Sequence, residues 1–222
     1  MRRSPRPRCT PKFHRPDCGR STSRLIPGLN VVSRSGFGGI SHLARRFVEA
    51  LQSNGPMAED EAALCQMLSP QELVLYQRLN RTDRAHAVTN MVSMSVSLVA
   101  LKYEAGDAVW NEASVGPGMG QADLLVAAAM HDVGKSAANL STLGRVFATV
   151  VIAVAGRPKT AGWARSGRIG LYADHPRLGA EMLQAAGAHA VVVAWATEHH
   201  QPRESSLFAA PIRAAFDQAD RA

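Results

Sequence analysis

The stretch Ala129-Met130-His131-Asp132-Val133-Gly134-Lys135 has the strongest influence on how the rest of the chain is interpreted. A histidine and an aspartate stand side by side at the end of the apolar run 124–130, and a glycine and a lysine follow at once. Polar side chains deep in apolar sequence need partners, because burying them alone costs free energy. The stretch is therefore either a helix that ends in polar residues or part of a site, and ligand-type residues elsewhere at helix ends favour the site.

Apolar residues at helical spacing predict an all-α fold, a helical bundle, and no convincing hairpin signal occurs. Ser69-Pro70-Gln71-Glu72 predicts a capping box with proline in the first turn. The expected helices are 41–51, 59–68, 70–79, a long helix capped by Thr82 or Asp83 and running to Gly106, one ending at Gly134, 141–155, 176–187, 188–199, and a last one from Leu207. We expect a loop over 106–120 and an irregular, mobile segment over 157–170.

Composition divides the chain into a basic tail and a neutral body. Residues 1–24 carry a net charge of +7, which equals the net charge of +7 for the whole chain, so the remainder sums to zero. Residues 1–40 are rich in proline and glycine with little apolar periodicity, which predicts disorder. We therefore expect a disordered basic tail (1–40), N-terminal helices packing on the core (41–81) and one main domain (82–222).

Charge and hydropathy also limit the partners of the chain. A neutral body argues against nucleic-acid binding except through residues 1–24. The longest apolar run, Val146 to Ala155, is about half of the roughly 20 residues that a membrane span needs. Three cysteines do not make a disulfide framework in a chain of 222 residues. These features favour a cytoplasmic protein without a membrane span, and they leave the oligomeric state open.

Ligand-type residues recur at the predicted helix ends. Beside the His131-Asp132 pair they are His86, His175, His199, His200 and Asp217, with Asp220 as an alternative to Asp217 one turn away. His42 and His189 are expected to be ordinary surface or packing residues. Mixed imidazole and carboxylate ligands suit Mn, Fe, Co, Ni or Zn. Their number exceeds the need of one open ion, which indicates one or two divalent transition-metal ions, two of them sharing a bridging carboxylate.

These residues resemble the motifs of the HD-domain metal-dependent phosphohydrolases. The resemblance rests on His86, His131-Asp132 with Gly134-Lys135, and Asp217, in the family's order His, His-Asp, Asp, over residues 82–221. His175-Pro176-Arg177-Leu178-Gly179-Ala180 and Glu198-His199-His200 are similar to the extended HD-GYP branch, whose extra histidines bind a second metal. The chain departs from that branch after His200, where Gln201-Pro202-Arg203-Glu204 replaces the glycine-tyrosine-proline loop. An HDIG-type relative that is not a full HD-GYP domain is the resulting expectation.

The resemblance implies an enzyme that hydrolyses a nucleotide or another small phosphoester with metal-activated water. Asp132 would bridge the ions, with His131, His86 and Asp217 on the first and His175, His199 and His200 on the second. Lys135 would meet phosphate charge, or else act as a cation at a helix C-terminus. Arg84 and Glu198 are candidates for supporting contacts. A non-catalytic signalling module on the same fold and a phosphodiesterase of cyclic or linear dinucleotides are the alternatives.

Overall fold

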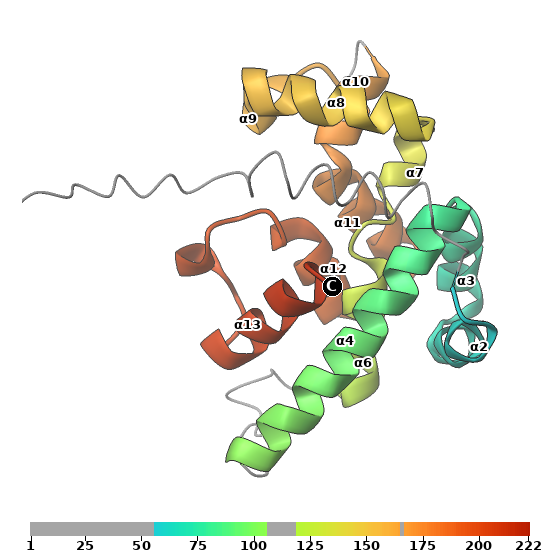
Figure 1. The fold of residues 1–222 in the computed structure, drawn as a ribbon, viewed down its shortest axis with the longest axis vertical. Helices are drawn as coiled ribbons and strands as arrows, with labels where there is room; N and C mark the ends of the chain where they lie inside the picture. Colours follow the sequence, from blue (N-terminus) through green and yellow to red (C-terminus); the bar gives the residue numbers. More distant parts are fainter. Residues whose placement is uncertain (1–55, 106–118, 165–166) are drawn as a thin grey trace, which may run out of the picture. The chain divides into compact units, whose positions relative to one another are not determined.

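The computed structural model describes residues 56–105, 119–164 and 167–222, and within these ranges the chain is helical and contains no strand (Figure 1). The prediction of an all-α fold is therefore confirmed. The helices are α2 (Ala58–Met67), α3 (Pro70–Gln77), α4 (Arg81–Ala105), α6 (Gln121–Met130), α7 (Lys135–Ala138), α8 (Thr142–Ala155), α9 (Arg157–Ala161), α10 (Arg168–Ala173), α11 (His175–Ala185), α12 (Ala190–Glu198), the 3-10 turn η2 (Arg203–Ser205) and α13 (Ala210–Ala219).

Side-chain caps set several of these helix starts. The predicted capping box of α3 is present: the Ser69 hydroxyl accepts from the Glu72 amide, and the Glu72 carboxylate accepts from the Ser69 amide. Ser141 caps α8 in the same way through the Gly144 amide. For α4 the prediction of Thr82 or Asp83 as cap was wrong, because Asn80 Oδ1 accepts from the Asp83 amide at 2.9 Å. The helix therefore begins about one residue earlier than expected.

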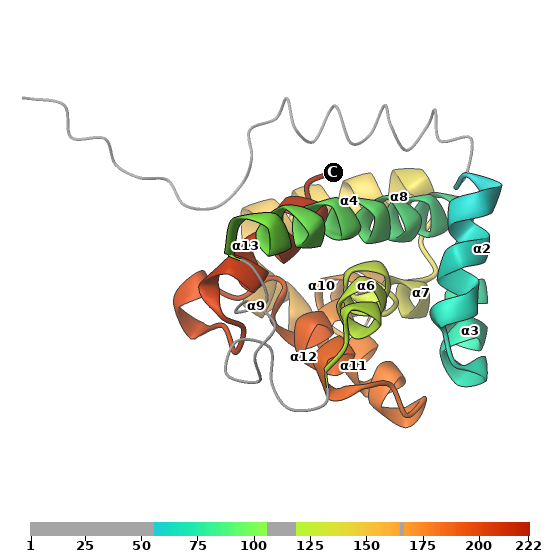
Figure 2. The ribbon, with the colours of Figure 1, turned by 90° about the horizontal axis from the view of Figure 1, so that it is seen from below.

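The core lies where α4, α6, α12 and α13 meet. α6 is buried along almost its whole length, and Figure 2 shows it between α4 on one side and α11 and α12 on the other. Met94 and Leu98 of α4 are fully buried, as are Trp195 of α12 and Phe216 of α13, whose rings stack with centroids 4.4 Å apart. A helix that is apolar on all sides needs such enclosure. The turn that follows α6 is therefore held inside the protein.

The segment after α8 corrects one expectation. Residues 157–170 were predicted to be irregular, but α9 and the start of α10 lie there (Figure 1). Gly156 ends α8 at a φ of 85°, in the left-handed region that favours glycine, and Pro158 then occupies the first turn of α9. Gly170 lets α10 approach the preceding turn, since a Cβ there would lie 2.1 Å from the carbonyl carbon of Trp163.

Several expectations lie outside the described residues: the basic tail, the helix over 41–51 and most of the loop over 106–120. In the described part, no single helix has both the length and the apolar composition needed to cross a bilayer. One bent pair, Gln121–Ala138 with Thr142–Ala155, meets these criteria only when its parts are added across a 97° bend.

Candidate metal centre

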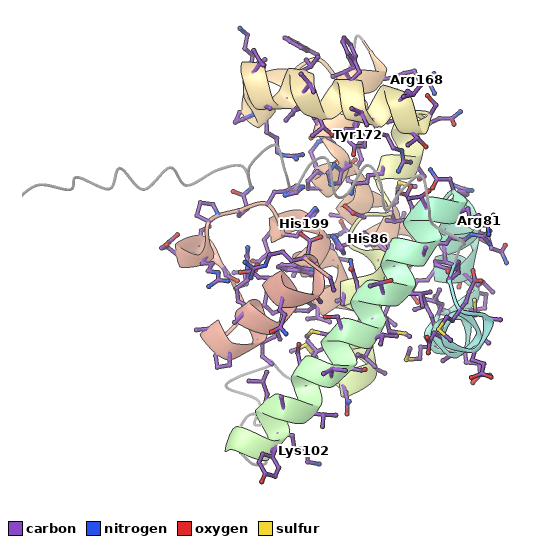
Figure 3. All side chains as sticks on the ribbon, viewed as in Figure 1. Arg81, His86, Lys102, Arg168, Tyr172 and His199 are labelled. Carbon is purple, nitrogen blue, oxygen red and sulfur yellow. The ribbon has the colours of Figure 1, made fainter. Side chains whose placement is uncertain are left out.

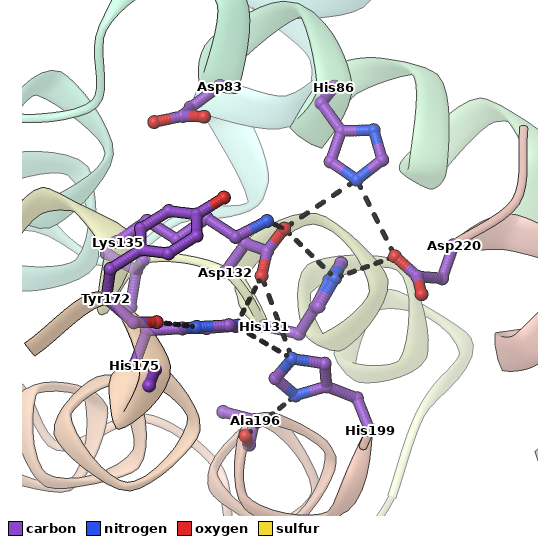
Figure 4. A network of polar contacts seen from close by, with 12 residues as sticks. Asp83, His86, His131, Asp132, Lys135, Tyr172, His175, Ala196, His199 and Asp220 are labelled. Carbon is purple, nitrogen blue, oxygen red and sulfur yellow. Dashed lines mark hydrogen bonds and ion pairs between the residues drawn. The ribbon is translucent and has the colours of Figure 1, made fainter. Parts of the chain in front are cut away.

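Seven ligand-type side chains from five parts of the chain converge at one place (Figure 4). They form two groups, each with potential ligand atoms within 4.8 Å of one another. The first, called the His86 group, consists of His86 of α4, His131 and Asp132 after α6, and Asp220 after α13. The second, called the His175 group, consists of His175 at the start of α11 and His199 and His200 after α12.

The carboxylate of Asp132 lies between the two groups and turns one oxygen toward each. Its Oδ1 is 3.1 Å from Nε2 of His175 and 3.7 Å from Nε2 of His199. Its Oδ2 is 3.5 Å from Nε2 of His131 and 3.7 Å from Nε2 of His86. On the far side of the His86 group, Asp220 Oδ1 lies 3.2 Å from Nε2 of His131 and 3.6 Å from Nε2 of His86. This is the arrangement that a bridging carboxylate requires.

Backbone carbonyls orient three of the histidines. Nδ1 lies 2.9 Å from the Ala128 oxygen in His131, 2.7 Å from the Tyr172 oxygen in His175, and 2.9 Å from the Ala196 oxygen in His199. Each partner is three residues earlier, so the turn that ends a helix or precedes the next one supplies it. Because a carbonyl only accepts, Nδ1 carries the proton in each ring, which leaves Nε2 free to coordinate a metal.

The His175 group fits a cation for a further reason. Nε2 of His175 and Nε2 of His199 lie 3.2 Å apart. Burial lowers the pKa of both imidazoles, so the neutral rings turn lone pairs toward each other. Two facing acceptors do not attract, whereas a metal ion between them would bind both. The chemistry of the donors therefore matches a transition-metal ion that accepts imidazole ligands.

Both carboxylates of the centre are ionised. Burial alone would raise the pKa of Asp132, but Lys135 and His131 together hold it well below its usual range. Burial also opposes ionisation of Asp220, and hydrogen bonds from His131 and His86 hold its pKa well below the usual range. His131 responds in the opposite sense: burial would lower its pKa, and the two carboxylates raise it. The centre thus presents two negative charges to a bound cation.

Lys135 lies inside the centre. Its Nζ contacts Oδ2 of Asp132, the oxygen on the side of the His86 group. Burial would lower the pKa of Lys135, but the Asp132 charge raises it, so the side chain stays an ammonium. Lys135 is the first residue of α7, and its side chain contacts a carboxylate, which does not match the alternative of a cation at a helix C-terminus.

One predicted ligand is corrected. Asp217 was aligned with the final ligand position, but the structure places Asp220 in the His86 group. The Asp217 carboxylate instead accepts from Nε of Arg213 at 2.9 Å and from Nε of Arg203. The helix register decides this: α13 ends at Ala219, and Asp220 at its end faces His86 and His131.

Two glycines in the predicted motifs have a packing role. Gly134 lies directly under the start of α11: a Cβ on it would be 2.1 Å from the His175 carbonyl oxygen and 2.6 Å from the Gly179 nitrogen. Gly179 is close to it from the other side, at 3.1 Å from a built Cβ to the Gly134 nitrogen. The backbone of the Asp132 turn can therefore approach α11 and bring His175 to Asp132.

Arg213 is a supporting residue that the sequence analysis missed. Its guanidinium is buried, lies 4.9 Å from the Trp195 ring centroid, and donates to the Glu198 carbonyl at 3.4 Å and to the Gln201 carbonyl at 3.0 Å. These carbonyls flank His199 and His200. Its Nη1 also lies 3.3 Å from the Glu198 carboxylate, so the expected support from Glu198 acts through Arg213. An arginine at apolar-face spacing in α13 was the available signal.

We expect Arg213→Lys to weaken metal binding at the His175 group by about 10–100-fold, the cost typical of losing a group that orients a ligand. Lysine keeps the charge but cannot hold both flanking carbonyls. The measurement is the number of tightly bound Co²⁺ ions and their visible absorption, together with the melting temperature. Arg221→Lys is the control, since Arg221 donates to the Asp217 carbonyl on the same helix. Loss of stability with unchanged Co²⁺ binding would contradict an orienting role.

Other supporting contacts lie around His86. The amide of Asn90, one turn along α4, is buried and lies 3.2 Å from Nε2 of His86. Asp83, one turn before His86, forms a two-pronged ion pair with Arg145 of α8. Arg84, the other expected supporting residue, lies 3.6 Å from Glu61 of α2 instead. On the opposite side, desolvation and then the charge of Arg157 lower the pKa of His200.

Fold and centre together define an all-helical protein with a cluster of histidines and aspartates that could hold metal ions. Comparisons with protein-family models, with curated proteins and with solved structures give no significant match.

Proposed function

We propose that this chain is a metal-dependent phosphohydrolase of the HD type that acts on a small phosphoester. The observation that carries the proposal is the position of Asp132, with one carboxylate oxygen toward the His86 group and the other toward the His175 group. Two ligand groups that share one carboxylate are typical of paired-metal hydrolytic sites. The order of the ligands along the chain, with Asp220 in the last position, agrees with the resemblance to the HD family.

Divalent ions in such a centre supply Lewis acidity, which makes water a stronger acid and offsets the charge of a phosphoryl group. The protein supplies orientation. The carbonyls of Ala128, Tyr172 and Ala196 hold three imidazoles with Nε2 turned inward. Because these partners belong to the helix backbone, the ligand atoms need little rearrangement when a cation arrives.

Lys135 has the charge and position to contact the substrate. In the absence of substrate its ammonium contacts Asp132, the carboxylate shared by the two groups. A compact ammonium is well suited to a phosphate oxygen, and developing negative charge there is stabilised by a cation held in advance. The exposed His200 lies at the other side of Asp132, at the edge of the centre. Substrate is therefore expected to enter between Lys135 and His200.

A matched pair of variants tests the proposal. Asp220→Asn should reduce metal content and lower kcat/KM for phosphate release by at least about 10²-fold, since it removes a charged ligand. Asp217→Asn changes the same residue type in the same helix but should keep both properties within about threefold, because Asp217 contacts only arginines in the described contacts. Metal analysis and a phosphate-release panel over nucleotides and simple phosphomonoesters provide the measurement.

Two results would count against the proposal. If the wild-type protein binds metal but releases no phosphate across the panel, the centre is structural and the fold serves a non-catalytic role. If Asp217→Asn and Asp220→Asn exchange their expected outcomes, the ligand set is wrong. Activity confined to dinucleotides would retain the chemistry and change the substrate class.

A further inference from the structure

The outward side of α8 is apolar and exposed. It is called here the α8 outer face, and its members recur at helical spacing on one side: Leu143, Val146, Phe147, Val150 and Val154. Exposure reaches 62% for Phe147 and 84% for Val154, whereas Ala148 and Ile152 on the inward side are buried. Figure 3 shows apolar side chains projecting from α8 away from the other helices. An exposed apolar patch of this kind marks an interaction surface.

The charge of the surrounding sequence is one-sided. No aspartate or glutamate occurs between Asp132 and Asp174, so the whole segment that carries α7 to α10 lacks negative side chains. Its basic residues are Lys135, Arg145, Arg157, Lys159, Arg165 and Arg168.

Three of these cations are not neutralised by a carboxylate. Lys135 and Arg145 form ion pairs with Asp132 and Asp83. Among the residues that the structure describes, Arg157, Lys159 and Arg168 form no ion pair with a carboxylate. Arg157 donates to the Ala173 carbonyl and Arg168 to the Ala138 carbonyl, and neither contact removes the positive charge. The α8 outer face is thus accompanied on α9 and α10 by uncompensated positive charge, together with the partly exposed Trp163.

We propose that the α8 outer face docks on the surface of a membrane that contains anionic lipid. Apolar side chains on one side of a helix enter the boundary between headgroups and acyl chains, while neighbouring lysine and arginine side chains meet the lipid phosphates. Tryptophan at the rim is typical of such contacts. This is attachment to a surface without spanning, and it does not rest on the proposed phosphohydrolase function.

Two other occupants fit the observations less well. A second copy of the chain would place the same uncompensated cations against each other, and like charges across an interface are unfavourable. An amphipathic peptide typically enters a groove between elements, whereas the α8 outer face is the outward side of one helix (Figure 1). An anionic surface is complementary in both respects.

The test is vesicle flotation with the full chain. Vesicles of phosphatidylcholine alone are compared with vesicles of phosphatidylcholine and phosphatidylglycerol in equal parts, at salt high enough to screen the basic residues 1–24. The wild type should bind the anionic vesicles. The double variant Phe147→Asp with Val150→Asp should bind at least about tenfold more weakly, because it replaces apolar contacts by charges that lipid phosphate repels.

A matched control uses equally exposed apolar residues elsewhere. Val96 and Val99 of α4 are 63% and 65% exposed and lie outside the acid-free segment. Val96→Asp with Val99→Asp should bind like the wild type. Lys159→Glu should weaken binding to anionic vesicles, and Lys102→Glu on α4 should not. Brominated lipid should quench wild-type fluorescence more than that of Trp163→Phe.

Several results would overturn the proposal. They are wild-type-like binding by the Phe147→Asp, Val150→Asp variant, equal loss in the α4 control, or no binding by the wild type. Sedimentation without lipid provides the last arm: a wild-type dimer that the α8 variant abolishes would assign the face to a second copy. Circular dichroism and retained metal content show that each variant is folded.

Discussion

Asp132→Asn is expected to remove metal from both ligand groups at once. The carboxylate is the one side chain within 3.7 Å of histidines in both groups, so its loss takes a charged ligand from each ion. A neighbouring group that only orients a ligand costs about 10–100-fold in affinity, and a shared ligand should cost more. Phosphate release should fall by at least about 10²–10³-fold. Metal analysis after dialysis and the phosphate-release assay measure the two effects.

The substitution also leaves Lys135 buried beside an amide, which destabilises the protein by about 3–5 kcal/mol if the charge stays unpaired. The double variant Asp132→Asn with Lys135→Met removes that charge and still lacks the bridging ligand. Asp123→Asn is the control on the same helix, since its carboxylate caps α6 through the Gly120 amide. If the double variant folds and still carries both ions, Asp132 does not bridge the centre.

Gly134→Ala is expected to lower the free energy of unfolding by about 3 kcal/mol, the upper end of overpacking costs. The added Cβ would meet the His175 carbonyl oxygen at 2.1 Å and the Gly179 nitrogen at 2.6 Å, and both are backbone atoms that cannot turn aside. In a chain of this size each kcal/mol lowers the melting temperature by about 2–4 °C. Thermal denaturation followed by circular dichroism measures the change.

Two further glycines make this prediction specific. Gly179→Ala should cost less, because its Cβ would lie 3.1 Å from the nearest atom, the Gly134 nitrogen. Gly167→Ala should be within about 0.5 kcal/mol of the wild type, since nothing lies within 4 Å of its Cβ and its φ of 176° is extended. Equal effects at all three positions would show that the contact between the Asp132 turn and α11 does not matter.

The helices themselves were largely predictable because their signals are local. Apolar spacing and the Ser69 and Ser141 caps lie within a few residues of the structure they specify. The segment 157–170 was missed because its two short helices depend on packing: Gly170 permits the close approach of α10 to Trp163. Asn80, the actual cap of α4, was missed although asparagine is a common cap.

Most of the candidate centre was also predictable, because its ligands sit in short motifs at helix ends. The choice between Asp217 and Asp220 was not. The two residues are three positions apart on one helix, and only the placement of α13 against α4 and α6 decides which one faces His86 and His131. Arg213 was invisible for the same reason, since its partners, the carbonyls of Glu198 and Gln201, come from another part of the chain.

The sequence by itself determined the helical fold class, the neutral charge of the body and the identity of six of the seven ligand-type residues that converge, His131 and Asp132 first among them. These are properties of local pattern and residue type. Only the tertiary structure decided that Asp132 turns one oxygen to each group and that Asp220 completes the first. Such facts depend on where helices far apart in sequence meet, and that is set by packing of the whole core.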